Sequence, residues 1–370
     1  MNSVVRLFKS LFVPCFGLVF LMASAPANAQ YHLTNLVSNQ VGQAPNIDPL
    51  LANAWGLTRT ATSPWWISDN DTGWSTVYDQ SGNIQGIKVL IPTQGNGPSS
   101  PTGLNGPGTP TGIVATPSKT EFLVQGQSSH FIFAALDGTI SAWAPGVNGN
   151  QSTIVVDNSA SKASYTGLAI SGNASGNMLY AADNTNNHID MFDNTFTFVK
   201  SFGDPSIPIT FSVFGVQDIN GIVYVTYAVP NIGAGGYVDQ FQEDGTLIGT
   251  LIQGLRLNQA WGVALAPSNF GPLSNTLLVS NNAVEGTINA FNFKTGDFVG
   301  TIREHGRRIV LNNLWGVAFG AGNTSSGPTN TLYVTVGQGI GTSELAGTFA
   351  SIVFDPHDHD HDHDDDGGSR

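Results

Sequence analysis

The stretch Trp261-Gly262-Val263-Ala264-Leu265 is one copy of a block that recurs along the chain. Trp, Phe or Thr precedes a glycine in each copy, and Leu, Ile or Val follows it. The repeated glycines are Gly56, Gly112, Gly167, Gly215, Gly262 and Gly316. They are spaced 56, 55, 48, 47 and 54 residues apart. A period of this length predicts stacked structural units rather than one irregular domain.

Each unit contains short runs of residues that are typical of β-strands. In the fifth unit, residues 276–279 form a second apolar run, residues 286–291 alternate apolar and polar side chains, and residues 298–302 form a fourth run. Gly, Asn, Asp and Pro separate such runs, and no helical periodicity is evident. Four antiparallel strands repeated six times predict an all-β fold, a six-bladed β-propeller. Two independent β-sandwiches are the alternative, but no change of composition marks a linker between them.

The two ends of the chain are predicted to close the ring. The last unit offers three strands, at about 316–319, 331–336 and 348–354. Residues 31–37 form a further apolar run that precedes the first unit. We expect this run to be the outer strand of the last blade.

The N-terminus has the pattern of a secretion signal. Arg6 and Lys9 precede an apolar run from Leu11 to Met22, and Ala27-Asn28-Ala29 fits the cleavage rule. We therefore expect a signal peptide at 1–29, a mature chain from Gln30, a secreted or periplasmic protein, and no membrane anchor after cleavage. A retained anchor is the alternative, but Pro14 interrupts the short apolar run. The single cysteine, Cys15, lies within this segment, so no disulfide is expected in the propeller at 30–355.

Charge excludes nucleic acid as a partner. Without Arg6 and Lys9, 11 of the 13 basic residues remain against 26 acidic ones, which is a net charge of −15. Nucleic acids and anionic lipids require basic patches. We expect a monomer that binds a protein or glycan partner.

Residues 356–370 form a tail rich in His and Asp, without apolar residues, and are predicted to be disordered. The predicted metal ligands are His357, His359, His361 and His363. Imidazole suits Zn, Ni and Cu. The alternative is a solvated acidic tail whose metal affinity is incidental.

A ligand site is predicted at one mouth of the axial channel. The loops between second and third strands, and those that lead into each first strand, surround this mouth. The predicted ligand-binding residues are Asp69, Asn70, Asp137, Asp183, Asn184, Tyr227, Asn281, Asn282 and Gln338. Trp55, Thr111, Thr166, Phe214, Trp261 and Trp315 start the first strands beside them. Such a mouth suits a sugar, or Ca²⁺ held by oxygen ligands.

The alternative for these positions is structural. Asp and Asn are common turn residues because they cap their own backbone and tolerate left-handed conformations. Tryptophan beside a repeated glycine is expected to pack between blades. His130, His188 and His305 have no His neighbour at ligand spacing, and are predicted to be isolated core or surface residues.

The repeated Gly-(Val/Ile/Leu)-Ala element and the Gly-x-Ile-x-x-Phe strand resemble the NHL repeat. Residues 131–143, 54–57 and 66–70 also resemble an uncharacterised family of secreted bacterial NHL-like propellers. The resemblance spans nearly all of 31–354 and implies the fold, without an activity.

Two functions follow from these observations. The first is an extracytoplasmic binding scaffold of unknown ligand. The second is a metal-dependent lactonase or lyase with its site at the axial mouth, as on related six-bladed propellers. The gluconolactonase-like enzymes use Glu, Asn and Asp on a metal, whereas this chain has only five glutamates and none at an evident inner strand end.

Overall fold

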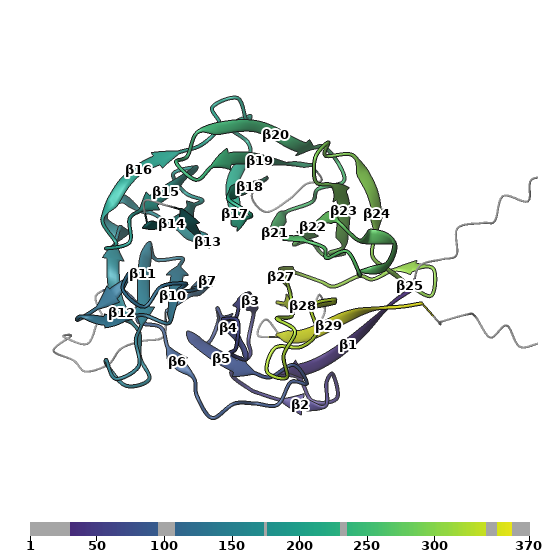
Figure 1. Cartoon of the computed structure of the whole chain (residues 1–370), viewed down its shortest axis with the longest axis horizontal. Coiled ribbons are helices and arrows are strands. Elements are labelled where there is room, and N and C mark those ends of the chain that lie inside the picture. Colours follow the sequence, from purple (N-terminus) through teal and green to yellow (C-terminus); the bar gives the residue numbers. More distant parts are fainter. Residues whose placement is uncertain (1–29, 95–107, 174–175, 230–234, 338–345, 357–370) are drawn as a thin grey trace, which may run out of the picture.

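The computed structural model describes residues 30–94, 108–173, 176–229, 235–337 and 346–356. Its strands form six antiparallel sheets arranged as blades around a central axis (Figure 1). Blade 1 contains β3 (Ala54–Thr58), β4 (Trp65–Asp69), β5 (Trp74–Tyr78) and β6 (Val89–Leu90). Blade 2 contains β7 (Pro110–Ala115), β10 (Phe131–Ala135), β11 (Thr139–Trp143) and β12 (Thr153–Asp157). Blade 3 contains β13 (Tyr165–Asn173), β14 (Gly176–Asp183), β15 (His188–Phe192) and β16 (Phe198–Phe202).

The second half of the chain continues this pattern. Blade 4 contains β17 (Ser212–Ile219), β18 (Ile222–Ala228), β19 (Gly236–Gln242) and β20 (Leu247–Gln253). Blade 5 contains β21 (Ala260–Leu265), β22 (Thr276–Asn281), β23 (Ile288–Asn292) and β24 (Phe298–Thr301). Two small hairpins lie outside the blades, β8 (Leu123–Val124) with β9 (Gln127–Ser128) and β25 (Arg303–Glu304) with β26 (Arg307–Arg308). The six-bladed prediction is therefore confirmed, and the two-sandwich alternative is wrong.

Blade 6 joins the two ends of the chain. It consists of β27 (Leu314–Phe319), β28 (Thr331–Val336), β29 (Thr348–Asp355) and β1 (Gln30–Ser38), with β2 (Asn46–Ile47) along the outer edge. β1 pairs with β29 from Gln30 opposite Asp355 to Ser38 opposite Thr348. The Tyr31 hydroxyl also donates to the Phe270 carbonyl of blade 5, at 2.9 Å. The predicted closure by the N-terminal strand is confirmed.

The repeated glycines allow neighbouring inner strands to approach closely. A Cβ on Gly262 would lie 2.7 Å from the Trp315 carbonyl of blade 6, and one on Gly56 would lie 2.5 Å from the Thr111 carbonyl of blade 2. Gly316 faces Trp55 and Leu57, so the last blade meets the first in the same way. The register of these inner strands shifts beside the glycine, as at a β-bulge. Each repeated glycine in the sequence therefore corresponds to a close contact between the inner strands of two neighbouring blades.

The hydrophobic core lies mainly between the faces of adjacent blades. Where blade 6 meets blade 1, Trp65 packs with Tyr333 and Phe349. Blade 4 contributes Val238 to a cluster that contains Leu277 of blade 5. Each blade thus buries apolar side chains on both faces, which explains why its strands are apolar for most of their length.

Helix is confined to two 3₁₀ turns in the described part of the chain, η1 (Ser159–Ser161) and η2 (Gly271–Leu273). None of the described helices has the length and apolar character needed to span a membrane. The predicted signal segment 1–29, Gln338 and the tail histidines His357, His359, His361 and His363 lie outside the described residues.

Candidate functional site

One end of the axial channel is filled by aromatic side chains. Trp55, Trp261 and Trp315 meet there with Leu136 and Phe214 packed against them, and we call this group the tryptophan plug. The rings of Trp55 and Trp315 stack with centroids 3.6 Å apart, and Trp261 packs edge-on against Trp315 at 5.8 Å. The Trp261 indole N–H donates to the Thr166 carbonyl at 2.8 Å. The plug lies at the predicted mouth, because its tryptophans start the first strands.

Three predicted ligand-binding asparagines bond to the next blade. The Nδ2 groups of Asn70, Asn184 and Asn282 donate to the carbonyls of Pro110, Val213 and Leu314, at 3.0, 2.7 and 3.4 Å. Each acceptor immediately precedes the Thr, Phe or Trp of the repeated block. These amides therefore connect consecutive blades around the ring.

The residues just before these asparagines are buried. Asp183 accepts hydrogen bonds from the backbone N–H groups of Ser164 and Asn186, and Asn281 accepts one from Asn258 N–H at 2.7 Å. Asp69 is fully buried with no hydrogen-bond donor to either oxygen in normal geometry, and burial raises its pKa well above the ordinary value.

Asp137 and Tyr227 also contact protein groups. Asp137 accepts bonds from the Thr139 N–H and hydroxyl, and from the Gln94 N–H. The buried Tyr227 hydroxyl accepts a bond from the Asp204 N–H at 3.3 Å. All described members of the predicted set except Asp69 therefore form hydrogen bonds with other protein groups, and their role as ligand contacts stays a prediction.

The other end of the axis is open. Behind the plug the channel narrows to a cavity of about 30 Å³, and four of the six repeated glycines line it. Beyond it lies a cavity of about 540 Å³, which we call the lower mouth. All six inner strands line it, through residues 57–59, 113–115, 170, 217–220, 263–265 and 317–319. Its walls combine apolar side chains with polar groups, of which Arg59, Gln217 and Asp218 are the main ones.

Arg59 and Asp218 are held differently in the lower mouth. The Arg59 guanidinium donates to the Phe319 carbonyl through Nε and Nη2, at 3.0 and 2.6 Å, and lies over the Trp65 ring. Burial lowers its pKa. Burial raises the pKa of Asp218 to about 6, and the charge of Glu243 also raises it. The hydrogen bond from Gly221 N–H acts in the opposite direction. Oδ2 of Asp218 is buried without a hydrogen-bond partner.

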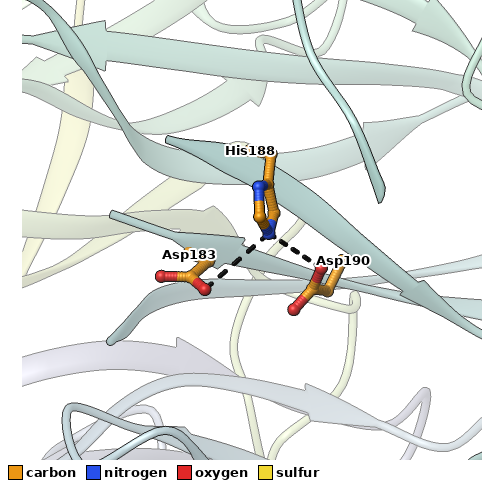
Figure 2. Close-up of side chains that lie close together, drawn as sticks. All are labelled: Asp183, His188 and Asp190. Carbon is orange, nitrogen blue, oxygen red and sulfur yellow. Dashed lines mark ion pairs between the residues drawn. The ribbon is translucent and has the colours of Figure 1, made fainter. Parts of the chain in front are cut away.

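A second polar group lies in blade 3. Asp183 ends β14 and is directly opposite His188, the first residue of β15, in the antiparallel pairing. Asp190 is two residues beyond His188, and alternate residues of a strand share one face. His188 Nε2 lies 3.1 Å from Asp190 Oδ1 and 3.8 Å from Asp183 Oδ2 (Figure 2). The pleat of this hairpin therefore gathers all three side chains.

Neighbouring groups support this Asp–His–Asp cluster. The hydroxyls of Ser201 and Tyr165 donate to Asp190 at 2.6 and 2.8 Å. The hydrogen bond with Asp190 raises the pKa of His188. Burial alone would raise the pKa of Asp190, but its bonds from His188, Ser201 and Tyr165 outweigh that effect and lower it.

The prediction that His188 is isolated is wrong, because it lies beside these two carboxylates. No second histidine lies at ligand spacing in the sequence, but the partners are aspartates. The signal was present, because a turn between Asp183 and His188 places them opposite each other in a hairpin.

Comparison with known proteins gives relatives without an assigned function. No family model matches the chain. Uncharacterized protein R648 of Acanthamoeba polyphaga mimivirus is 31% identical over 308 residues, covering 78% of this chain and 73% of R648. Uncharacterized protein L690 of the same virus is 29% identical and 79% of each chain is covered. Uncharacterized protein R640 is 33% identical over 207 residues, which are 51% of this chain and only 38% of R640.

Solved structures share the fold at low identity. The aldose sugar dehydrogenase of Escherichia coli has a TM-score of 0.55 and 12% identity, with 87% of this chain and 99% of that chain covered. A streptogramin B lyase has a TM-score of 0.51 and 13% identity, with 88% and 98% covered. These likenesses support the propeller fold, while the identity and coverage of R648 show that this chain belongs to the same family as that mimivirus protein.

Proposed function

We propose that this protein is a binding scaffold and that its ligand, a glycan or a segment of a partner protein, enters the lower mouth. The volume of about 540 Å³ is within the range of small-ligand sites. We further propose that the protein acts outside the cytoplasm, because residues 1–29 have the pattern of a secretion signal.

The observation that carries this proposal is the unpartnered Oδ2 of Asp218. Buried polar atoms normally have a hydrogen-bond partner, and leaving one without a partner costs roughly 1–3 kcal/mol. Asp218 belongs to the lining of the lower mouth, so a rotation of its side chain toward the cavity would let a ligand hydroxyl or amide supply the missing donor.

The rest of the lining suits an amphipathic ligand. Three of the five guanidinium N–H groups of Arg59 bond to protein carbonyls, which leaves two for a ligand acceptor. Leu57, Ile113 and Val317 supply apolar walls. A sugar ring, or an extended peptide with an apolar side chain, presents both kinds of surface.

The enzyme alternative lacks a specific observation at the axis. A metal-dependent lactonase or lyase would need several metal ligands at the mouth. Among the described residues, the one group of three His, Cys, Asp or Glu side chains close enough to share an ion is in blade 3. Lyase and dehydrogenase activities belong to the structural neighbours, whose likeness extends to the fold alone.

A blocking variant tests the scaffold proposal. Ala115→Trp places a large side chain in the lower mouth, and Ala160→Trp places the same side chain at an exposed position as a matched control. Both variants and the original chain would be probed on a glycan array and a peptide array. We expect Ala160→Trp to bind the same glycans or peptides as the original chain. Ala115→Trp and Asp218→Asn should bind them at least tenfold more weakly. Equal binding by all variants would move the ligand away from the lower mouth.

A further inference from the structure

We propose that Asp183, His188 and Asp190 form a binding site for a divalent metal ion of the zinc type. The three residues offer two carboxylate oxygens and one imidazole nitrogen within 4.8 Å of one another. This donor set suits zinc and its first-row neighbours, whereas Ca²⁺ prefers oxygen donors alone. None of the three residues lines the lower mouth, so the site does not depend on the scaffold proposal.

The donor geometry is close to what zinc requires. Bonds of about 2.0–2.2 Å in a tetrahedral site place neighbouring donors about 3.3 Å apart. The imidazole Nε2 is 3.1 Å from one carboxylate oxygen and 3.8 Å from the other. Figure 2 shows both carboxylates directed at the same ring nitrogen. Small side-chain rotations would therefore open a position for an ion between the three.

The supporting hydrogen bonds would orient the ligands. Tyr165 donates to Oδ2 of Asp190, while Oδ1 faces His188. The amide of Asn186 donates to Oδ2 of Asp183 at 2.7 Å. Partners of this kind fix the orientation of metal-binding carboxylates.

The charge of the group favours a cation. Two buried carboxylates face one imidazole, and no Lys or Arg of the described chain forms an ion pair with either of them. Blade 4 has Asp239 at the position of Asp190, and blade 5 has Asn289, but Tyr237 and Thr287 replace the histidine there. The combination of ligands is thus a feature of blade 3, beyond what the repeat requires.

One side of the group remains accessible. His188 is 32% exposed, whereas the two aspartate side chains are at most 7% exposed. The three residues line a surface cavity of about 600 Å³ together with Asn158, Ser161 and Phe198. A metal held by three protein ligands would keep its fourth position open to water or a small ligand on that side.

Zinc titration of the full chain tests the proposal. The background would carry His357→Gln, His359→Gln, His361→Gln and His363→Gln, so that the tail cannot mask the site. Competition between this protein and a coloured chelator for zinc sulfate gives the stoichiometry and affinity. We expect one zinc ion per chain, and at least tenfold weaker binding after His188→Gln or Asp183→Asn. His32→Gln is the matched control, because His32 pairs with the single carboxylate of Glu304 at 2.9 Å; we expect no change there.

A second measurement uses the background protein alone, so it gives a result even if the variants do not fold. Cobalt(II) bound by the background protein should give the intense visible absorption of a four-coordinate site, and equimolar zinc should remove it. No stoichiometric zinc in the background, or unchanged affinity in a folded His188→Gln variant, would overturn the proposal. Either result would leave His188 as an ion-pair partner of the two aspartates.

Discussion

At the scale of single residues, contact between blades explains why glycine is repeated. Gly262 has the Trp315 carbonyl and the Ser280 hydroxyl where its Cβ would be, at 2.7 and 2.8 Å. The same hydroxyl donates to the Trp315 carbonyl and accepts from the Gly262 N–H. A side chain at position 262 would therefore push the two blades apart and break the hydrogen bonds of the Ser280 hydroxyl.

Gly262→Ala should destabilise the protein. Overpacking of this kind typically costs about 1–3 kcal/mol. Gly86 has no atom within 4 Å of its Cβ position, so Gly86→Ala is a matched control and should be neutral. Urea unfolding of both variants measures the difference. Equal stability of the two variants would show that the blades can separate without cost.

Asp239→Asn should change how stability depends on pH. Asp239 is fully buried, and neither of its carboxylate oxygens has a hydrogen-bond partner in normal geometry. Burial raises its pKa to about 6, and the charge of Asp204 adds to this rise. Because the folded pKa exceeds the unfolded value of 3.8, stability from this group is complete below pH 4 and is lost as pH rises through 6. We expect Asp239→Asn to be more stable at pH 7, by at most about 3 kcal/mol, and unchanged at pH 4. Thermal melting at both values tests this, and a variant less stable at pH 7 would contradict it.

At the scale of elements, β1 completes blade 6. Without it, β29 would be an exposed edge strand, and Tyr31 would no longer bond to blade 5. Deletion of residues 31–38 should therefore lower the melting temperature and cause association, since an open edge can pair with another chain. Size-exclusion chromatography and thermal melting measure both effects. A monomer with an unchanged melting temperature would show that closure is dispensable.

A circular permutation is the control for that deletion. Gln30 lies opposite Asp355, so a two-residue Asn-Gly turn can join β29 directly to a relocated β1. We expect the permuted chain to recover the monomer and most of the lost stability. Failure to recover would mean that the deletion acts through something other than the missing strand.

The elements that the sequence predicts well are those with local signals. Residues 331–336 and 348–354 were expected as strands and correspond to β28 and β29, because β-branched runs end at turn residues. In blade 1 the apolar run in the sequence extends over 87–91, whereas the outer strand in the structure is only Val89–Leu90, since an outer strand pairs on one side only.

The bonds of Asn70, Asn184 and Asn282 to the next blade depend on the curvature of the ring, and no local sequence pattern predicts that curvature. The lower mouth depends on it too, because six strands distant in sequence line it.

At the scale of the whole molecule, the ring has two unequal ends. Residues of five blades meet in the tryptophan plug, while the other end widens into the lower mouth. The narrow cavity between them is too small for more than a water molecule. A ligand can therefore reach the axis from one side only, and the plug gives the ring stability where the inner strands converge.

Trp315→Ala should weaken the ring and open the closed end. Trp315 contacts Trp55, Trp261 and Phe214, so its loss leaves a cavity at the point where three other blades meet. Removal of a buried tryptophan typically costs about 3–5 kcal/mol. Trp74→Ala is the matched control, because Trp74 is only half-buried and lies under Lys88 on a third strand. We expect the Trp315 variant to lose more stability in urea, and its remaining plug tryptophans to become accessible to acrylamide quenching. If the stability and quenching of Trp315→Ala match those of Trp74→Ala, the plug does not hold the blades together. The asparagine bonds between blades would then have to explain the closed end of the axis alone.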